Sequence, residues 1–457
     1  MRTDFPPTLI GKKSAKVLCA AGAALLLEPL LFCFAQPARP IAAMMSAPLS
    51  HVRESGFAFF TVAVANAHSF PTQPLSSVPG KNAAPPLLYA STESSPDVLY
   101  FGKVEVPDPF VAFGVKGKKY AVVSALEFAR VKKNSDFDVV LPLQSYLQRA
   151  RELWPQRKPG AAEVIYLAAK DFKLRRFTVP ADFPAGIYEK LYELGLDLVV
   201  ADGALFPQRE IKSPSEAAAI REGNACSAAG FAAAEKILRA AKVSGRKLVY
   251  RGKTVTSEML RFAIEVACLE NGAVSTGTIV AGGDQACDPH GRGSGALRPH
   301  ELIIIDIFPR VTRTGFHGDM TRTFLRGRAS DHQRALVAAV RGAQLAAFKA
   351  IRTGADGRAV HRTCIDYFAK HGYETKHSAN GSVGFFHGTG HGLGLAVHEP
   401  PGMGLNAENK LKKNSVVTVE PGLYYPGLGA CRIEDVVQVT DTRPRLLSRY
   451  HYNWELR

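Results

Sequence analysis

The chain lacks the sequence features of several large classes of protein. It contains no glycine-rich nucleotide-binding loop, no coiled-coil repeat and no CxxC pair of the redox type. Cysteine is scarce, and the seven cysteines are widely scattered, at positions 19, 33, 226, 268, 287, 364 and 431. An odd number of scattered cysteines argues against a disulfide framework and favours reduced thiols in a cytoplasmic protein.

Acidic residues are fewer than basic ones. The chain has 41 Asp and Glu against 57 Lys and Arg, which gives a formal net charge of +16. Seven basic and three acidic residues lie in positions 1–86, so about +12 belongs to the rest of the chain. A basic surface can bind nucleic acid or an anionic membrane, so a binding protein is the rival to an enzyme.

Long hydrophobic runs are also missing. The apolar run Val17–Leu27 is too short to span a membrane as a helix, and Glu28-Pro29 interrupts it. Basic residues precede the run, which fits a secretory signal peptide with a cleavage point near Ala35. An equal alternative is that the true start is Met44 or Met45. The cysteines favour the cytoplasm, whereas a genuine signal peptide would make the protein exported.

We therefore predict that residues 1–86 are an extension before the folded domains. Its last part, Ser69–Pro86, is rich in proline, serine and alanine and is typical of a linker. The whole chain of 457 residues is longer than one core usually supports, so two domains are expected after the extension.

From residue 87 to 212, apolar strand-like segments alternate with amphipathic helical ones. This alternation predicts an α/β domain with a small sheet covered by helices. The predicted strands are 109–115, 119–124, 138–141, 164–168 and 196–201, and the predicted helices are 125–133, 145–154 and 185–194.

A second domain, 213–457, is predicted to begin at a helix cap. Ser213-Pro214-Ser215-Glu216 is a capping box with proline at the first helical position, and it opens an alanine-rich helix to about Ala241. Further helices are expected at 257–270 and from the cap at Ser330 to about Arg352. Apolar strands between and after these helices predict an α+β domain, an antiparallel sheet with outer helices.

Chemistry concentrates in the segment from His387 to Glu399. It places His387, His391 and His398 at spacings of four and seven among closely set glycines. Glycine permits close backbone approach, and neutral imidazole is a common metal ligand and proton-transfer group. Three histidines in thirteen residues predict a functional site rather than a core.

Four acids lie in apolar, strand-like surroundings elsewhere in the chain. Asp306 interrupts the run 302–308, and Asp319 follows it in the segment 318–324; Glu420 and Glu434 lie in similar apolar segments nearer the C-terminus. A buried carboxylate without a partner is costly, so these acids are expected to share a cation.

The order Asp, Asp, His, Glu, Glu resembles the M24 family of dinuclear metallopeptidases, whose catalytic domain has the pita-bread fold. The histidine segment resembles the aminopeptidase P and prolidase branch of that family. The resemblance covers about residues 87–457 and implies a creatinase-like N-terminal domain followed by the catalytic domain. It implies as metal ligands Asp306, Asp319, His391, Glu420 and Glu434, with Asp319 and Glu434 bridging two ions. Here the two aspartates are thirteen positions apart rather than the usual eleven, a difference that a longer hairpin tip absorbs.

One histidine and four carboxylates form a hard, oxygen-rich ligand set. Such a set suits two divalent ions, Mn²⁺ before Co²⁺ or Zn²⁺, better than a thiolate site would. Two ions a few Å apart can share a water, lower its pKa and stabilise both the attacking and the developing oxygens of a hydrolysis. Hydrolysis of a peptide bond is the expected reaction.

The resemblance also implies catalytic roles for nearby residues. Glu420 would act as general acid and base while it ligates, and His398 would support the tetrahedral intermediate. His290 matches a substrate-binding histidine, and His387 would line the same pocket. Arg432 would orient the ligand carboxylates.

The substrate class follows from the resemblance. The branch cleaves the bond between an N-terminal residue and proline, so the expected partner is a peptide with proline in second position. Prolidases often hold a dipeptide's carboxylate with an arginine after the last histidine, but none occurs between His398 and Glu420. This favours an Xaa-Pro aminopeptidase over the alternative, an Xaa-Pro dipeptidase, although the lysines at 410, 412 and 413 could replace that arginine.

The resemblance implies a homodimer or higher homo-oligomer, without a nucleic-acid partner or a membrane span. The alternative of another class is a pita-bread protein that has lost its metals and binds protein or RNA. Retention of all five ligand positions argues against it.

Overall fold

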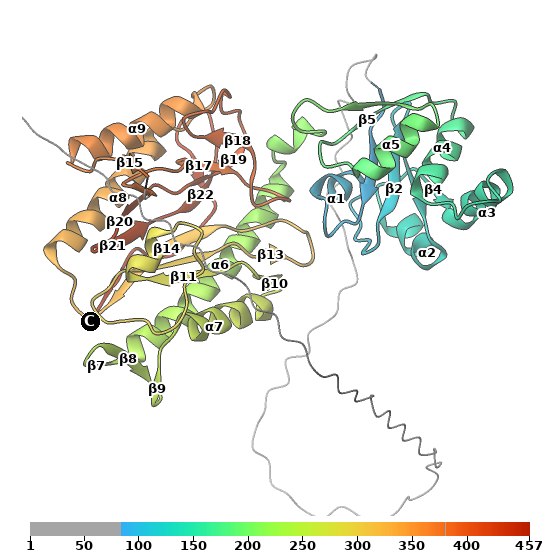
Figure 1. Cartoon of the computed structure of the whole chain (residues 1–457). Helices are drawn as coiled ribbons and strands as arrows, with labels where there is room; N and C mark the ends of the chain where they lie inside the picture. Colours follow the sequence, from blue (N-terminus) through green and yellow to red (C-terminus); the bar gives the residue numbers. More distant parts are fainter. Residues whose placement is uncertain (1–83, 380) are drawn as a thin grey trace, which may run out of the picture. The chain divides into compact units, whose positions relative to one another are not determined.

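The computed structural model describes residues 84–379 and 381–457 (Figure 1). The predicted signal peptide, the alternative start sites and most of the predicted linker lie outside the described residues. Pro85 and Pro86, at the end of the predicted extension, already bond to the strands that follow. The Thr178 amide donates to the Pro85 carbonyl at 2.8 Å, and the Gly114 amide donates to the Pro86 carbonyl at 3.0 Å.

The α/β pattern predicted for the N-terminal half is confirmed. A four-stranded sheet has the order β1-β2-β3-β4, antiparallel except for the parallel β3–β4 pair, and β5 and β6 form a second parallel pair. Helices pack on these strands (Figure 1). The elements are β1 (Leu87–Ala90), α1 (Pro96–Gly102), β2 (Phe110–Val115), β3 (Lys118–Val123), α2 (Ala125–Asn134), β4 (Val139–Pro142), α3 (Leu143–Leu153), α4 (Ala161–Asp171), β5 (Arg176–Val179), α5 (Ala185–Glu193) and β6 (Asp197–Val200).

One predicted strand is wrong, because residues 164–168 belong to the helix α4. A short, wholly apolar segment has no periodicity that separates a buried strand from a buried helix. The polar residue before it decides the outcome, since the Gly160 amide donates to the Glu163 carboxylate at 2.7 Å and so starts a helix. The strand that pairs with β6 is β5, which the sequence pattern did not predict.

The predicted cap at Ser213 is confirmed. The Glu216 amide donates to the Ser213 hydroxyl at 3.2 Å, and the Ser213 amide donates to the Glu216 carboxylate at 2.8 Å. The helix that follows is α6 (Pro214–Ala240). The predicted domain boundary at this point stays a prediction.

Two antiparallel sheets dominate the C-terminal half, as predicted. Their orders are β11-β12-β14-β24 and β18-β17-β19-β22-β23, with one parallel pair, β14–β24. The remaining elements are η1 (Pro207–Glu210), β7 (Lys242–Ser244), β8 (Lys247–Tyr250), β9 (Lys253–Thr254), α7 (Ser257–Glu270), β10 (Ala273–Val274), β11 (Ile279–Gly282), η2 (Gly283–Cys287), β12 (Ile303–Ile307), β13 (Arg310–Val311), β14 (Met320–Arg326), α8 (Asp331–Ala350), α9 (Gly357–Lys370), β15 (Lys376–Ser378), β16 (Gly381–Val383), β17 (Gly390–Gly392), β18 (Glu399–Met403), β19 (Val416–Val419), β20 (Gly422–Tyr425), β21 (Gly429–Arg432), β22 (Asp435–Gln438), β23 (Arg445–Leu446) and β24 (Glu455–Leu456).

The alternation of β12 turns Asp306 away from the helices. Ile303, Ile305 and Ile307 pack in one core with side chains of α6 and α7. Ile304 packs on the opposite face. Because successive side chains of a strand point to opposite faces, Asp306 shares the face of Ile304. One strand therefore serves both the core and the site.

Helix α6 and the segment before β14 approach backbone to backbone. A Cβ on Gly223 would lie 2.4 Å from the Gly318 amide nitrogen, and a Cβ on Gly318 would lie 2.2 Å from the Gly223 carbonyl carbon. Only glycine fits at either position. Next to this contact, the Asp319 amide donates to the Asn224 side-chain oxygen at 3.1 Å, which fixes the position of Asp319.

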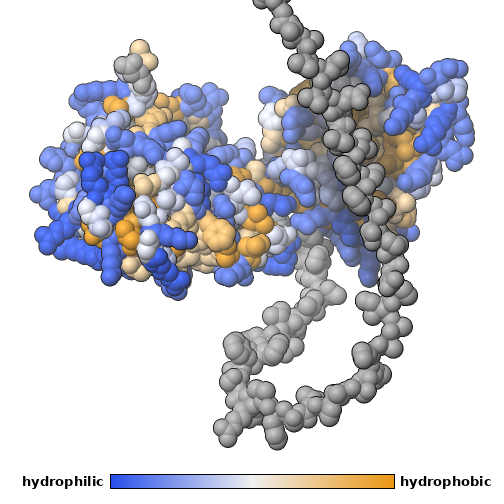
Figure 2. All heavy atoms as spheres, turned by 60° about the horizontal axis from the view of Figure 1, so that its bottom comes forward, coloured by the Kyte–Doolittle hydropathy of each residue, from blue (hydrophilic) through white to orange (hydrophobic). Residues whose placement is uncertain are grey.

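The surface turned forward in Figure 2 is largely hydrophilic, with scattered apolar side chains. Among the exposed apolar residues are Phe262 and Leu269 of α7. In the part of the chain that the structure describes, no helix has both the length and the apolar character needed to cross a membrane.

Gly223→Ala is expected to destabilise the fold by about 1–3 kcal/mol, because the new methyl group overpacks a contact between two backbones. Thermal unfolding followed by circular dichroism measures this. Gly186→Ala is the matched control, since Gly186 lies in α5 with open space around its Cβ position. Alanine should leave that helix unchanged or slightly stabilised. Equal melting temperatures for the two variants would contradict the role given to the glycine contact.

Candidate metal centre

One cavity of about 920 Å³ brings together all the predicted site residues. These are His290, Asp306, Asp319, His387, His391, His398, Glu420, Arg432 and Glu434. The rest of its wall is largely apolar and includes Ile279, Phe308 and Phe386. Residues that are more than 100 positions apart in the sequence thus share one site.

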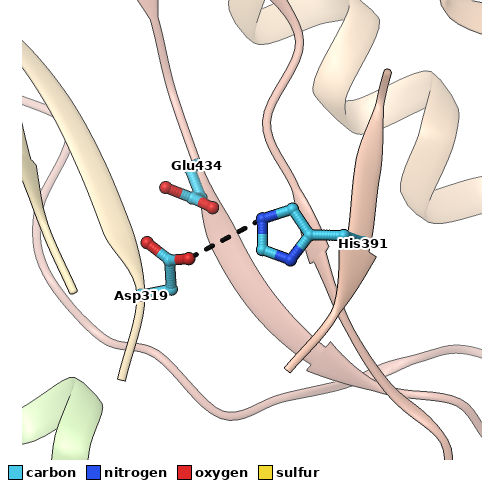
Figure 3. A group of neighbouring side chains, drawn as sticks. All are labelled: Asp319, His391 and Glu434. Atoms are coloured by element: carbon cyan, nitrogen blue, oxygen red, sulfur yellow. Dashed lines mark ion pairs between the residues drawn. The ribbon is translucent and has the colours of Figure 1, made fainter. Parts of the chain in front are cut away.

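Asp319, His391 and Glu434 form the tightest group in this cavity (Figure 3). Each offers one ligand atom, and these atoms lie within 4.8 Å of one another. The Nε2 atom of His391 is 3.8 Å from Asp319 Oδ2 and 3.2 Å from Glu420 Oε1. Asp319 precedes β14, His391 lies on β17, and Glu434 lies between β21 and β22. Both large sheets therefore contribute to the site.

The imidazole of His391 is oriented for ligation. Its Nδ1 lies 3.1 Å from the Gly392 carbonyl oxygen, and because a carbonyl only accepts, Nδ1 carries the proton. The lone pair of Nε2 then faces the carboxylates. The His391 amide also donates to the Thr418 hydroxyl at 3.1 Å, and that hydroxyl donates to Glu420 at 3.0 Å.

The crowded carboxylates perturb one another's pKa values. Burial, with repulsion from Asp306, raises the pKa of Asp319 well above its usual value. Burial, with repulsion from Asp319, likewise raises the pKa of Glu434 well above its usual value. Burial and mutual repulsion both disfavour the charged carboxylates, and a divalent cation would offset both.

Glu420 and His391 behave as a coupled pair. Burial opposes the ionisation of Glu420, but the hydrogen bond from His391 outweighs it and lowers the Glu420 pKa to about 2. Burial also disfavours a charged His391, yet Glu420 raises the His391 pKa to about 9. A proton on Nε2 and a metal ion compete for the same lone pair.

Asp306 supplies the clearest sign of a missing partner. Its Oδ2 accepts a hydrogen bond from Arg432 Nη2 at 2.7 Å. Its Oδ1 is buried and has no hydrogen-bond partner among the described residues. An unpaired buried carboxylate oxygen costs free energy, and a cation beside Oδ1 would remove that cost. The residues present therefore fit divalent cations.

Arg432 is buried and committed to neighbours of the site. Besides Asp306, its guanidinium donates to the Tyr424 hydroxyl at 3.0 Å, to the Pro289 carbonyl at 3.2 Å and to the Thr321 hydroxyl at 3.3 Å. The Thr321 hydroxyl in turn donates to Glu434 at 2.8 Å. The orienting role of Arg432 stays a prediction.

Tyr424 was not predicted from the sequence. The Nδ1–H of His387 donates to the Gly388 carbonyl at 2.8 Å, so the Tyr424 hydroxyl donates to His387 Nε2, also at 2.8 Å. Burial lowers the pKa of His387 to about 4 and raises that of Tyr424 to about 12. Both ring nitrogens of His387 are thus occupied. A tyrosine in the apolar segment just after Glu420 is the one sequence signal for this arrangement.

His398 lies beside the ligand histidine, and His290 lies on an exposed part of the cavity wall. The rings of His398 and His391 have centroids 4.3 Å apart. Burial and the neighbouring His391 lower the pKa of His398, which favours a neutral imidazole there. The His290 amide donates to the Asp288 side chain at 3.1 Å, which shapes its loop.

Glu399 holds the loop that carries His398. Its carboxylate accepts from Lys212 Nζ at 2.6 Å and from Arg209 Nη2 at 2.5 Å. Arg209 also donates to Asp97 of α1 at 2.6 Å. These buried charges pair with one another, so the position of His398 depends on residues far from it in the sequence. Sequence analysis did not predict this network.

Residues 218–441 match the model of metallopeptidase family M24. This region belongs to metallopeptidase family M24. The match includes Asp306, Asp319, His391, Glu420 and Glu434, so the resemblance seen in the order of these residues is confirmed at the level of the family.

Curated relatives of this M24 chain carry peptidase names. It is 32% identical over 173 residues to the Xaa-Pro dipeptidase of Pyrococcus furiosus, covering 38% of this chain and 47% of that protein. It is 34% identical over 171 residues to the uncharacterized peptidase YqhT of Bacillus subtilis, covering 37% of this chain and 46% of that protein. The chain thus spans about half the length of the curated relatives it matches.

Solved structures extend the likeness beyond the M24 match. The X-Pro aminopeptidase of Thermotoga maritima is 20% identical, with a TM-score of 0.67 over 82% of this chain and 97% of that one. The prolidase of Pyrococcus horikoshii is 22% identical, with a TM-score of 0.66 over 81% of this chain and 95% of that one. The predicted fold class, an α/β domain before a pita-bread domain, is confirmed.

Adding Mn²⁺ to the metal-stripped protein is expected to raise its melting temperature. Binding at a concentration 100-fold above the dissociation constant stabilises a fold by about 2.7 kcal/mol. Glu434→Gln should lose this response, because the variant lacks one predicted ligand carboxylate. The loss of that charge also lowers the repulsion among the carboxylates, which the cation would otherwise offset. Glu374→Gln is the control, since Glu374 is 71% exposed and lies outside the cavity, and it should respond like the wild type. A wild-type protein that does not respond, or a Glu434→Gln variant that responds fully, would contradict the site.

Proposed function

We propose that the protein is a metal-dependent peptidase that hydrolyses the N-terminal Xaa-Pro bond of peptides. The observation that carries this proposal is the meeting of four carboxylates and one imidazole in a single cavity of an M24 domain. Relatives named Xaa-Pro dipeptidase and X-Pro aminopeptidase support the substrate class.

Two divalent ions are proposed as cofactors, with Mn²⁺ favoured over Co²⁺ and Zn²⁺ because the ligand set is hard and rich in oxygen. Asp319 and Glu434 would bridge the ions, and Asp306, His391 and Glu420 would complete the set. When bound, such ions polarise the scissile carbonyl group and activate water for attack.

The remaining steps belong to the chain's own side chains. Glu420 takes up the proton of the attacking water and passes it to the leaving proline nitrogen. His398, held neutral by its surroundings, donates an N–H to the oxygen of the scissile carbonyl group. His290 binds substrate, Arg432 holds Asp306 in place, and His387 lines the pocket and contacts Tyr424.

Two modes of Xaa-Pro cleavage are compatible with this site. The absence of an arginine between His398 and Glu420 favours an aminopeptidase that takes longer peptides, and a dipeptidase is the alternative. We also propose a creatinase-like domain at 87–212, a catalytic domain at 213–457, a homo-oligomer and a cytoplasmic location. The described cysteines support the last point, because Cys226, Cys268, Cys287, Cys364 and Cys431 are all free thiols.

Release of the N-terminal residue from Xaa-Pro, Xaa-Pro-Yaa and Xaa-Ala-Yaa tests the function. Metal-stripped protein should be inactive, and Mn²⁺ should restore cleavage of the two proline peptides only. The absence of cleavage with any divalent metal would reject the enzyme and favour a binding module of the pita-bread type.

Asp319→Asn is expected to lower kcat more than about 100-fold while the fold is kept. Changing a residue that only hydrogen-bonds to a metal ligand already lowers metal affinity or activity by about 10- to 100-fold, and loss of a ligand should cost more. Circular dichroism checks the fold. Asp331→Asn is the matched control, because Asp331 is 97% exposed, and it should keep full activity. Metal-dependent activity near the wild-type level in Asp319→Asn would show that Asp319 is not a ligand.

A further inference from the structure

Two arginines line the cavity, and their surroundings differ. Arg432 is buried and makes hydrogen bonds to Asp306, Tyr424, Thr321 and Pro289. Arg292 has weaker partners in the part of the chain that the structure describes: its Nε donates to the Thr278 carbonyl at 3.4 Å, and its Nη2 lies 3.7 Å from Glu265.

The ion pair between Arg292 and Glu265 is a weak competitor for an incoming anion. The two side chains are 52% and 39% exposed. A long, exposed ion pair contributes little free energy, because water and salt screen it. The guanidinium of Arg292 can therefore exchange this partner for a carboxylate at small cost.

The backbone below this side chain is held rigidly. The Val280 amide donates to the Arg292 carbonyl at 3.1 Å, and Arg261 Nη1 donates to the same oxygen at 2.6 Å. Gly293 follows at a φ of +70°, and a Cβ there would lie 2.0 Å from the Val280 carbonyl oxygen. The loop is therefore pinned against β11, and Arg292 projects from a fixed base.

Strand register places Arg292 near the metal ligands. Ile279 of β11 is the direct cross-strand partner of Asp306, and both line the cavity. Such partners are about 4.5–5.5 Å apart at Cα. Thr278, whose carbonyl accepts from Arg292, is one residue further along the chain. Arg292 and Asp306 thus lie on either side of Ile279 and line the same cavity.

This placement suits the end of a short substrate. In an Xaa-Pro dipeptide, the terminal carboxylate is one residue beyond the scissile carbonyl group, about 3.5 Å along an extended chain. The planar fork of an arginine matches a carboxylate with two parallel hydrogen bonds. Ile279 and Phe308 offer apolar wall for the proline ring.

We propose that Arg292 binds the C-terminal carboxylate of the substrate and makes Xaa-Pro dipeptides the preferred class. The inference rests on the proposed Xaa-Pro hydrolysis and names its specificity-determining residue. It reverses the preference for longer peptides, which rested on the absence of an arginine after the last histidine of the motif. Arg292 lies in the loop of His290, about 100 positions before that last histidine.

Ala-Pro and Ala-Pro-amide differ at the group that Arg292 would bind, so they form the test pair. With the wild type, the KM for Ala-Pro should be about 10- to 100-fold lower than for the amide, in line with a charged hydrogen bond. In Arg292→Gln, the KM for Ala-Pro should rise by that factor, while kcat and both constants for the amide stay unchanged. Arg292→Lys keeps the charge without the fork and should fall between the two.

Arg298→Gln is the matched control. Arg298 is 53% exposed and lies 3.7 Å from Glu301, so it resembles Arg292 in its surroundings, but it lies outside this cavity. It should leave the preference for Ala-Pro intact. If Arg292→Gln weakens Ala-Pro and its amide equally, or if the wild type shows no preference, Arg292 does not bind the carboxylate and the proposal is wrong.

A binding measurement separates this inference from the proposed function. Calorimetry on the metal-stripped protein compares Ala-Pro with its amide without cleavage. Tighter binding of Ala-Pro that Arg292→Gln abolishes supports the carboxylate site, and equal binding overturns it. Failure of the proposed function would appear in the cleavage assay instead: the metal-loaded wild type would cleave none of the proline peptides.

Discussion

The site depends on one electrostatic constraint, the mutual repulsion of four carboxylates gathered in one cavity. Asp306, Asp319, Glu420 and Glu434 line the same space, and Arg432 makes an ion pair with Asp306 alone. Burial makes ionisation costly, and the raised pKa values of Asp319 and Glu434 record that cost. Divalent cations would supply the charge that the protein itself does not, and this balance connects the fold to the proposed hydrolysis.

Rigid elements of the fold hold each carboxylate in place against this repulsion. Asp306 lies on a strand whose other face is core, and Asp319 is fixed by Asn224 beside a contact that only glycine permits. Threonine hydroxyls orient the two glutamates, Thr321 at Glu434 and Thr418 at Glu420. Ligands held in this way are already positioned before a metal ion binds, which lowers the cost of binding.

Sequence reasoning reached the features that are local in the chain. The capping box of α6, the strand β12 and the family relationship rest on short patterns, and the structure or the comparisons confirm them. It failed at residues 164–168, where a short apolar run was assigned as a strand but forms a helix. There the deciding contact was a single polar side chain.

The contacts that complete the site could not be predicted in the same way. Tyr424 meets His387 and Arg432 only because two segments fold together, and no periodicity marks it. The pairing of Glu399 with Arg209 joins positions 190 residues apart. Arg292 could not be predicted, because the family resemblance places the carboxylate-binding arginine after the last histidine of the motif, in a different stretch of the chain. The catalytic roles of the predicted residues remain predictions.

Counting bound metal ions tests the central claim most directly. Metal-stripped protein is equilibrated with Mn²⁺, and the metal bound per chain is measured by mass spectrometry and by equilibrium dialysis. The account predicts about two ions per chain, because five ligand residues with four carboxylates suit a pair of divalent ions. No bound ion, or a single ion at saturation, would contradict it.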